Sequence, residues 1–284
     1  MPVSTWTIAE PRKLAFEDPV TALHVRIVDG TVNVVGTDEP EARLEVSAIE
    51  GPPLIVTQED GRLTVAYEDL PWQDLLRWFD PKNRRRSAVV TLVVPAASSV
   101  EVGVIGAGAV VSGISGRTEV RGITGDSTLV GLTGAVRGES VSGSLEAQSV
   151  TGDLRFHSVS GDLTVVDGAT SVRAESVSGA MVLDVDPSGR PTDIRLATVT
   201  GEIAIRLPHP ADARVEANTA SGAVSNAFDD LRVGGQWGTK KITGTLGAGT
   251  GTLRATTVSG SIALLRRPPV EDDAYAAEPT GKVL

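Results

Sequence analysis

The spacing of glycines constrains the fold of this chain more than any other feature of its sequence. Seven glycines keep one nine-residue register, in which Thr170 takes the one missing position: Gly116, Gly125, Gly134, Gly143, Gly152, Gly161 and Gly179. A Ser or Thr precedes each glycine, and an apolar residue precedes that Ser or Thr, as in Val141-Ser142. A fixed short period of this kind indicates a repeat architecture in which each unit packs against its neighbours.

The residues between two of these glycines alternate as they do in a β-strand, where successive side chains point to opposite faces. The second and fourth residues after the glycine are mostly apolar, as at Leu154 and Phe156, and we expect them to face the core. Charged residues such as Glu119 and Arg155 hold the positions between them and are expected in water. The apolar residue seven positions after the glycine breaks the alternation, so we expect a bend that returns it to the core.

Two nine-residue units make a coil that can stack on the next coil at the strand spacing of ~4.8 Å. Gly201, Gly222, Gly244 and Gly260 extend the set of corners, and the spacings of 22, 21 and 22 residues from Gly179 to Gly244 fit one coil plus a short loop. The sequence therefore predicts an all-β protein, a parallel β-solenoid with about 18–22 residues per coil.

Composition and local pattern divide the chain into three parts. Residues 1–105 alternate less regularly and predict an N-terminal β-rich cap or irregular first coils, residues 106–267 form the solenoid, and residues 268–284 are expected to be a disordered tail. Only 4 Phe, 4 Trp and 2 Tyr occur beside 31 Gly, which favours a thin core of small and β-branched side chains.

One segment, residues 70–81, breaks the β-pattern and predicts a short amphipathic helix followed by a basic cluster. Aromatic residues beside basic ones suit an anionic membrane surface or a protein partner, whereas the alternative is a helix that covers an open side of the N-terminal β-layer. The candidate interaction residues are Trp72, Leu75, Leu76, Trp78, Phe79, Lys82, Arg84, Arg85 and Arg86.

Several functional classes are disfavoured. The chain has no Cys, and its three histidines, His24, His157 and His209, are far apart, so we predict no catalytic, cofactor-binding or metal-binding residues. Asp residues follow some corners, but Ala or Ser takes the same position at others, which argues against calcium binding because calcium requires six or more oxygen ligands. A net charge of −10 argues against nucleic-acid binding.

The Val-Ser-Gly corners from Val141 to Leu145, Val159 to Leu163 and Val177 to Met181, together with the strand Val89 to Pro95, resemble a known family. This is the bacterial β-strand-repeat family of domain of unknown function 4097, often labelled "putative adhesin", and the resemblance extends roughly from Val20 to Leu265. It implies a β-solenoid from an actinobacterial-type source, and it implies neither an established activity nor any catalytic residue.

We therefore expect a non-enzymatic β-solenoid scaffold that docks to a protein partner or an anionic membrane surface through Trp72–Arg86. The alternatives are a self-assembling, filament-like structural protein and, more weakly supported, a carbohydrate-binding or carbohydrate-active β-helix protein. The N-terminal residues do not show the pattern of a signal peptide, and the sequence contains no apolar run of ~18 residues. We expect a cytoplasmic location, with peripheral contact at the inner face of the membrane as an alternative.

Overall fold

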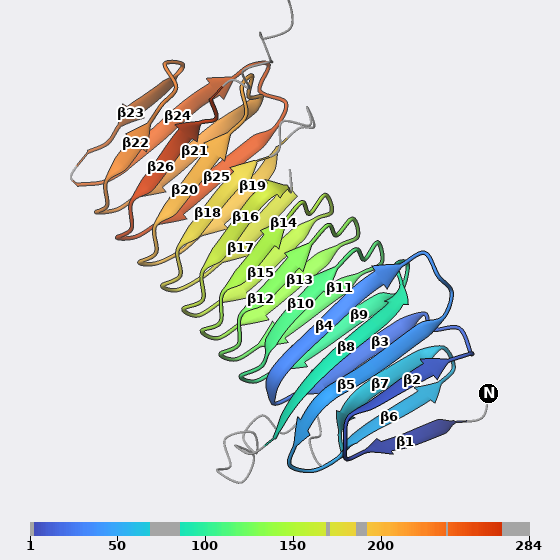
Figure 1. Cartoon of the computed structure of the whole chain (residues 1–284). Helices are drawn as coiled ribbons and strands as arrows, with labels where there is room; N and C mark the ends of the chain where they lie inside the picture. The colour runs from blue at the N-terminus through green and yellow to red at the C-terminus, as the bar shows by residue number, and fades with distance from the viewer. Residues whose placement is uncertain (1–2, 69–85, 169–170, 186–191, 237, 269–284) are drawn as a thin grey trace, which may run out of the picture.

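The computed structural model describes residues 3–68, 86–168, 171–185, 192–236 and 238–268, and these residues form β-strands and turns without a helix. The strands build two large sheets, here called sheet A and sheet B, which face each other along one elongated stack (Figure 1). The first strands lie at one end of the stack, and β23 and β24 lie at the other.

Sheet A has fourteen strands, which are given in their spatial order: β1 (Ser4–Ile8), β6 (Leu54–Glu59), β7 (Arg62–Tyr67), β3 (Ala22–Ile27), β9 (Ser99–Val104), β11 (Thr118–Gly122), β13 (Val136–Ser140), β15 (Leu154–Ser158), β17 (Ser171–Glu175), β19 (Asp193–Ala197), β25 (Thr252–Thr257), β21 (Ala213–Thr219), β24 (Lys240–Leu246) and β23 (Leu231–Gly234). Sheet B has twelve strands: β2 (Arg12–Phe16), β5 (Ala42–Glu50), β8 (Ser87–Pro95), β4 (Asp29–Thr37), β10 (Gly108–Ser112), β12 (Ser127–Val130), β14 (Leu145–Gln148), β16 (Leu163–Gly168), β18 (Met181–Val185), β20 (Ile203–Leu207), β26 (Ile262–Arg266) and β22 (Val224–Asn226).

From β9 to β20 the chain alternates between the two sheets, and each strand pairs in parallel with the strand two places further along the chain. Val136 pairs with Leu154, a shift of 18 residues, and Ser171 pairs with Asp193, a shift of 22 residues. One coil therefore adds one strand to each sheet. The prediction of an all-β protein is confirmed, and both sheets are mostly parallel, as a β-solenoid requires.

Corner glycines are required by the closeness of successive coils. A Cβ atom added to Gly161 would lie 2.0 Å from the carbonyl oxygen of Gly143, and one added to Gly179 would lie 2.0 Å from that of Gly161. Neither glycine has a positive φ, so the contact with the neighbouring coil, and not the turn conformation, excludes a side chain. The preceding hydroxyl also joins the coils, because Ser160 Oγ donates a hydrogen bond of 3.2 Å to the Val141 carbonyl.

The core between the sheets is thin and is filled by the residues predicted to face inward. The second and fourth positions after each corner, including Leu154 and Phe156, are almost fully buried. Phe156 is the largest of the fully buried side chains, and it fits because its neighbour in register is Gly138, where a Cβ would lie 3.1 Å from the Phe156 ring. A core of this thickness has little room for further aromatic rings.

The residue seven positions after a corner behaves differently at the two edges of the stack. At the edge where sheet B leads into sheet A, Ile114, Leu132 and Val150 are fully buried, as predicted. At the opposite edge the prediction is wrong, because the equivalent valines are 44–51% exposed and form a ridge, here called the valine ridge: Val141, Val159, Val177, Val199 and Val258.

Backbone conformation explains this difference. Gly131 and Ser149, which directly precede the buried Leu132 and Val150, have φ values of +63° and +52°. A left-handed residue redirects the chain, so the side chain after it turns into the core. The valine ridge has no such residue before it, and Ser158 uses the inward position to accept a 2.7 Å hydrogen bond from the Gly161 N–H.

Antiparallel strands close the N-terminal end of the stack. The coil made by β3 and β4 pairs in parallel with β9 and β10 on one side and with β7 and β8 on the other. Strands β6 and β1 then extend sheet A antiparallel to β7, and β5 and β2 extend sheet B antiparallel to β8. The predicted amphipathic segment at 70–81 joins β7 to β8 and lies outside the described residues.

The C-terminal coils do not stack in the order of the sequence. Strands β25 and β26 lie between the β19–β20 coil and the β21–β22 coil, so Gly260 stacks on Gly201 and Gly222 stacks on Gly260 (Figure 1). The predicted corner at Gly244 is wrong, because Gly244 lies inside β24 and pairs with Val215 of the antiparallel strand β21. Strands β24 and β23 complete sheet A.

Candidate binding surface

The outer face of sheet A carries a column of charged residues, which in the regular coils stand at the third position after every second corner. Strand register aligns eight of them on successive strands from β9 to β21: Glu101, Glu119, Arg137, Arg155, Arg173, Arg195, Arg254 and Glu216. The five consecutive arginines, Arg137 to Arg254 in this order, are here called the arginine ladder. Neighbouring strands lie ~4.8 Å apart, so the ladder brings like charges close together.

Sheet B has no comparable column at the equivalent position. Its aligned outward residues are small or uncharged except for one glutamate: Val110, Thr128, Glu146, Thr164, Val182, Ala204 and Ala263. The two faces of the stack therefore differ in chemistry although they share one repeat, and the charged surface belongs to sheet A.

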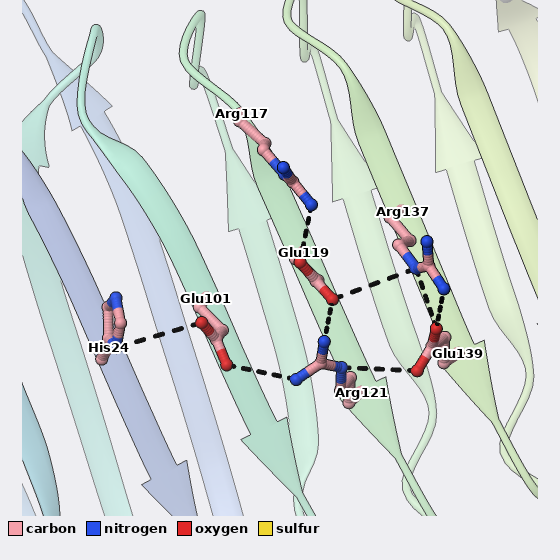
Figure 2. A network of polar contacts seen from close by, with 7 residues as sticks. All are labelled: His24, Glu101, Arg117, Glu119, Arg121, Arg137 and Glu139. Atoms are coloured by element: carbon pink, nitrogen blue, oxygen red, sulfur yellow. Dashed lines mark hydrogen bonds and ion pairs between the residues drawn. The ribbon is translucent and has the colours of Figure 1, made fainter.

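At the N-terminal end of the column, a network of ion pairs balances the charges (Figure 2). Arg121 in β11 lies between three carboxylates, at 3.3 Å from Glu101, at 3.3 Å from Glu139 and in direct contact with Glu119 (Figure 2). His24 in β3 extends the network, with its Nδ1 atom 3.9 Å from Glu101.

The prediction that Glu119 lies in water is wrong, because its side chain is only 11% exposed beneath the surrounding arginines. Arg117 lies 3.1 Å from Glu119, and Arg137 lies 4.0 Å away. Burial opposes the ionisation of Glu139, but the hydrogen bond from Arg137 and the charge of Arg121 outweigh burial and lower the pKa of this carboxyl group. The charged groups of the network are thus paired with one another, and few of them remain available to a ligand.

The remainder of the arginine ladder is balanced less completely. Arg173 and Arg195 share one carboxylate, that of Asp193, at 3.4 Å and 3.3 Å. The exposed side chain of Arg155 forms no hydrogen bond or ion pair with any residue in the described part of the chain. Positive charge therefore remains available at the centre of the ladder.

A basic depression of about 740 Å³ lies at the C-terminal end of the ladder and is here called the basic hollow. Its charged lining residues come from four neighbouring strands: Arg214 and Glu216 (β21), Arg232 (β23), Lys241 (β24) and Arg254 (β25). Threonine hydroxyls also line it: Thr243, Thr245 and Thr252.

Glu216 is the one acid in the basic hollow, and it neutralises part of the lining. Lys241 Nζ lies 3.0 Å from Glu216, and Arg254 lies 3.6 Å from it. The hydrogen bond from Lys241 lowers the pKa of Glu216, which stays ionised. Within the described residues, no ion pair or side-chain hydrogen bond involves Arg214 or Arg232, so the hollow has an excess of positive charge.

A second depression, of about 570 Å³, lies beside the ion-pair network and is here called the apolar groove. Val104 and the first residues along the valine-ridge edge, Ile123 and Val141, form its apolar walls, and the missing side chain at Gly122 opens it. Arg121 and Glu139 at its rim already neutralise each other. The groove therefore provides a hollow apolar surface, and the charged groups at its rim are already paired.

Most of the interaction residues predicted from the sequence, Trp72 to Arg85, lie outside the described residues. Arg86 is described, and it is largely buried with its guanidinium 5.6 Å from the centre of the Tyr67 ring. Burial of Tyr67 raises its pKa to about 12. Arg86 thus packs where β7 ends and β8 begins.

No reactive cluster appears on this surface. His24 and His157 lie on strands separated by β9, β11 and β13, and each contacts a glutamate, Glu101 at 3.9 Å and Glu175 at 3.8 Å. Among the described residues, no three His, Asp or Glu side chains come together to hold a metal ion, and no helix could cross a membrane. What this surface provides for binding is positive charge and two depressions, the basic hollow and the apolar groove.

The arginine ladder was not among the residues predicted from the sequence, although part of its signal is present in the repeat. Arg137, Arg155 and Arg173 stand three residues after the corner of every second nine-residue unit. Comparing alternate units, which share a sheet, would have revealed them. The pairing of Arg195 with Arg254 leaves no such signal, because these residues are far apart in the chain.

Three comparisons relate the chain to known proteins. A search of the curated proteins gives no match. Three solved structures are similar at low identity and low TM-score. A "putative cell adhesion protein" from Clostridium sporogenes has 9% identity and a TM-score of 0.27, with 91% of this chain and 100% of that chain covered. A "putative lipid binding protein" from Parabacteroides distasonis has 11% identity and a TM-score of 0.42, with 92% and 98% covered. A "putative adhesin" from Parabacteroides merdae has 9% identity and a TM-score of 0.40, with 93% and 96% covered.

The sequence family described as Toastrack DUF4097 matches residues 114–265, a range that includes all five residues of the arginine ladder. The family's description contains no activity. Because the match covers more than half of the chain, and the predicted family is the one found, this protein belongs to the Toastrack DUF4097 family.

Proposed function

We propose that this protein is a non-enzymatic binding scaffold, and that its binding surface is the outer face of sheet A from the arginine ladder to the basic hollow. The observation that carries the proposal is the unbalanced charge of this face. Arg155 has no partner within the described residues, although it lies between two further arginines in register. An anion bound there would relieve the repulsion between aligned like charges, which is unfavourable in the free protein.

The charge of the face contrasts with that of the whole chain, whose net charge is −10. From β13 to β23, the outward positions of sheet A hold eight Arg or Lys residues and five Asp or Glu residues. The basic residues are Arg137, Arg155, Arg173, Arg195, Arg254, Arg214, Arg232 and Lys241, and the acidic residues are Glu139, Asp153, Glu175, Asp193 and Glu216. Local positive charge on an acidic protein directs anions to one face.

Retention on a sulfonate cation-exchange resin tests this proposal. We expect the protein to bind the resin at low salt despite its net charge, and the triple variant Arg155→Ser, Arg173→Ser, Arg195→Ser to elute at clearly lower salt. A matched variant, Arg12→Ser, Lys13→Ser, Arg43→Ser, changes the net charge equally on sheet B. Equal elution of the two variants would show that the arginine ladder is not the binding surface.

A second proposal concerns docking of the segment Trp72–Arg86 to a partner or an anionic membrane. Its support is the sequence pattern and its place in the chain between β7 and β8, two strands that lie at the opposite end of the stack from the basic hollow. The two surfaces can therefore be tested independently. Cytoplasmic location and end-to-end self-assembly also stay predictions from the sequence.

A further inference from the structure

The arginine ladder and the basic hollow together form one continuous track along sheet A. The ladder runs along the stack, across the strands, with one guanidinium on each of five neighbouring strands. At a strand spacing of ~4.8 Å its first and last rungs are about 19 Å apart. Strands β21, β24 and β23 continue the same face into the basic hollow. A ligand that uses all of these charges is linear and carries a regularly repeated negative charge.

The chemistry of the arginines favours carboxylate as the repeated group. The planar guanidinium binds a carboxylate through two parallel hydrogen bonds, so each rung can hold one carboxylate in a defined orientation. One sugar unit of a 1,4-linked uronic acid chain is close in length to the strand spacing, and each unit carries one carboxylate. Because successive sugars are rotated about the chain axis, the carboxylates on one side of the chain meet rungs of the ladder at regular intervals and not every rung in turn.

The residues beside the ladder fit a sugar better than a nucleic acid. Hydroxyl and amide side chains stand on both sides of its C-terminal half, with Thr256 and Asn218 on one side and Ser171 and Thr252 on the other. Asp193 lies between Ser171 and Thr252, where it pairs with Arg173 and Arg195. These groups can form hydrogen bonds with sugar hydroxyls. Single-stranded nucleic acid is bound largely by stacking on aromatic side chains, and no Phe, Trp or Tyr lies on this face from β13 to β25 among the described residues.

We infer that this face binds an unbranched acidic polysaccharide with one carboxylate per sugar, which lies along the stack with its carboxylates on the arginine ladder. The inference rests on the proposed function and specifies its ligand class. Each exposed ion pair contributes little alone, so binding depends on several contacts made at once. Affinity should therefore increase with the number of sugars until the ladder and the basic hollow are filled.

Fluorescence anisotropy with end-labelled oligogalacturonates of two to ten sugars tests the inference, in the presence of a chelator because uronates also bind calcium. We expect the affinity to rise at least tenfold from the dimer to the pentamer, and methyl-esterified oligomers of equal length to bind at least tenfold more weakly. The variant Arg155→Ser, Arg195→Ser should lose at least tenfold in affinity for the pentamer, whereas the control Arg12→Ser, Arg43→Ser should bind like the wild type.

Two results would overturn the inference while leaving the proposed anion-binding surface intact, provided that the triple variant Arg155→Ser, Arg173→Ser, Arg195→Ser elutes from the sulfonate resin at lower salt than its sheet B control. One is an affinity that does not depend on the length of the oligogalacturonate. The other is tighter binding of polyphosphate or oligothymidylate with the same number of charges, which would identify a different class of polyanion. If this triple variant instead elutes like its sheet B control, the proposed function itself is wrong.

Discussion

Arg155 lies directly beside Arg173 on the adjacent parallel strand, and the Arg155 side chain contacts no acceptor among the described residues. Like charges opposite each other on neighbouring strands are destabilising, by about 0.2–1 kcal/mol. The proximity of Arg155 and Arg173 therefore does not stabilise the fold. The effect of removing Arg155 on the free energy of unfolding can be compared with the effect of removing an arginine that does form ion pairs.

We predict that Arg155→Ser leaves the free energy of unfolding unchanged or raises it by up to about 0.5 kcal/mol at low salt. Arg137→Ser should lower it, because Arg137 hydrogen-bonds Glu139 and lies 4.0 Å from the largely buried Glu119. Urea unfolding at low and high salt measures both effects. Equal destabilisation by the two changes would contradict the assignment of Arg155 as unbalanced.

The corner glycines give a second prediction. Gly161→Ala should lower the free energy of unfolding by about 3 kcal/mol or more, because its new Cβ would lie 2.0 Å from the Gly143 carbonyl oxygen and the coils must separate. Gly234→Ala is the matched control, since a Cβ there meets nothing within 4 Å, and it should be nearly neutral. Thermal unfolding of both variants distinguishes a contact effect from a general loss of glycine.

A third prediction concerns the left-handed residues that turn the chain into the core. Ser149 has φ +52° and an exposed side chain, so Ser149→Gly should stabilise the protein by about 0.5–1 kcal/mol by removing strain. Gly131 occupies the same place one coil earlier with φ +63°, and Gly131→Ala should destabilise by a similar amount although the site has open space. Changes of the same sign in both variants would exclude this explanation of the buried edge.

Asp184 gives a prediction of pH dependence. It accepts hydrogen bonds from Arg206 at 2.9 Å and Arg267 at 3.1 Å, and together these hold its pKa below the usual value although burial opposes them, with Arg206 making the largest contribution. Because the folded pKa is the lower one, this carboxylate stabilises the fold above its unfolded pKa of about 3.9. The stabilisation is lost as the pH falls through the folded pKa.

Asp184→Asn should therefore lower the free energy of unfolding by about 1–3 kcal/mol at pH 7, and the difference from the wild type should shrink as the pH falls below about 4. Denaturant titrations at several pH values measure the difference. Glu146→Gln is the control, because Glu146 is exposed on sheet B, and its effect should be small throughout. A difference for Asp184→Asn that stays constant down to pH 3 would contradict the role of its charge.

The segment Trp72–Arg86 gives a fifth prediction. If it docks to an anionic membrane, changing Trp72, Trp78 and Phe79 to Ser should abolish co-sedimentation with anionic liposomes, since aromatic rings anchor in the headgroup region. The ladder variant Arg155→Ser, Arg195→Ser should co-sediment like the wild type, because it lies on another part of the stack. Unaltered lipid and partner binding by the aromatic variant would rule out docking through this segment.

How far the sequence predicts this protein can be seen at particular residues. The inward positions of Leu154 and Phe156 follow from alternation alone, because the side chain of every second residue in a strand must face the core. Gly244 shows the limit. It matches the corner spacing, yet it lies within β24, because a Thr-Gly pair at the expected interval does not reveal which strand will pair with it.

The sequence by itself determined the repeat: the strands, the corners where backbones of adjacent coils touch, and the alternation that buries one face, all of which depend on residues close together in the chain. Only the tertiary structure decided the order in which coils stack at the two ends, because an open strand edge pairs with whichever strand fits it, regardless of position in the chain. The insertion of β25 and β26 between the β19–β20 coil and the β21–β22 coil is an example. It brings Arg254 beside Arg195, completes the arginine ladder and places the ladder against the basic hollow.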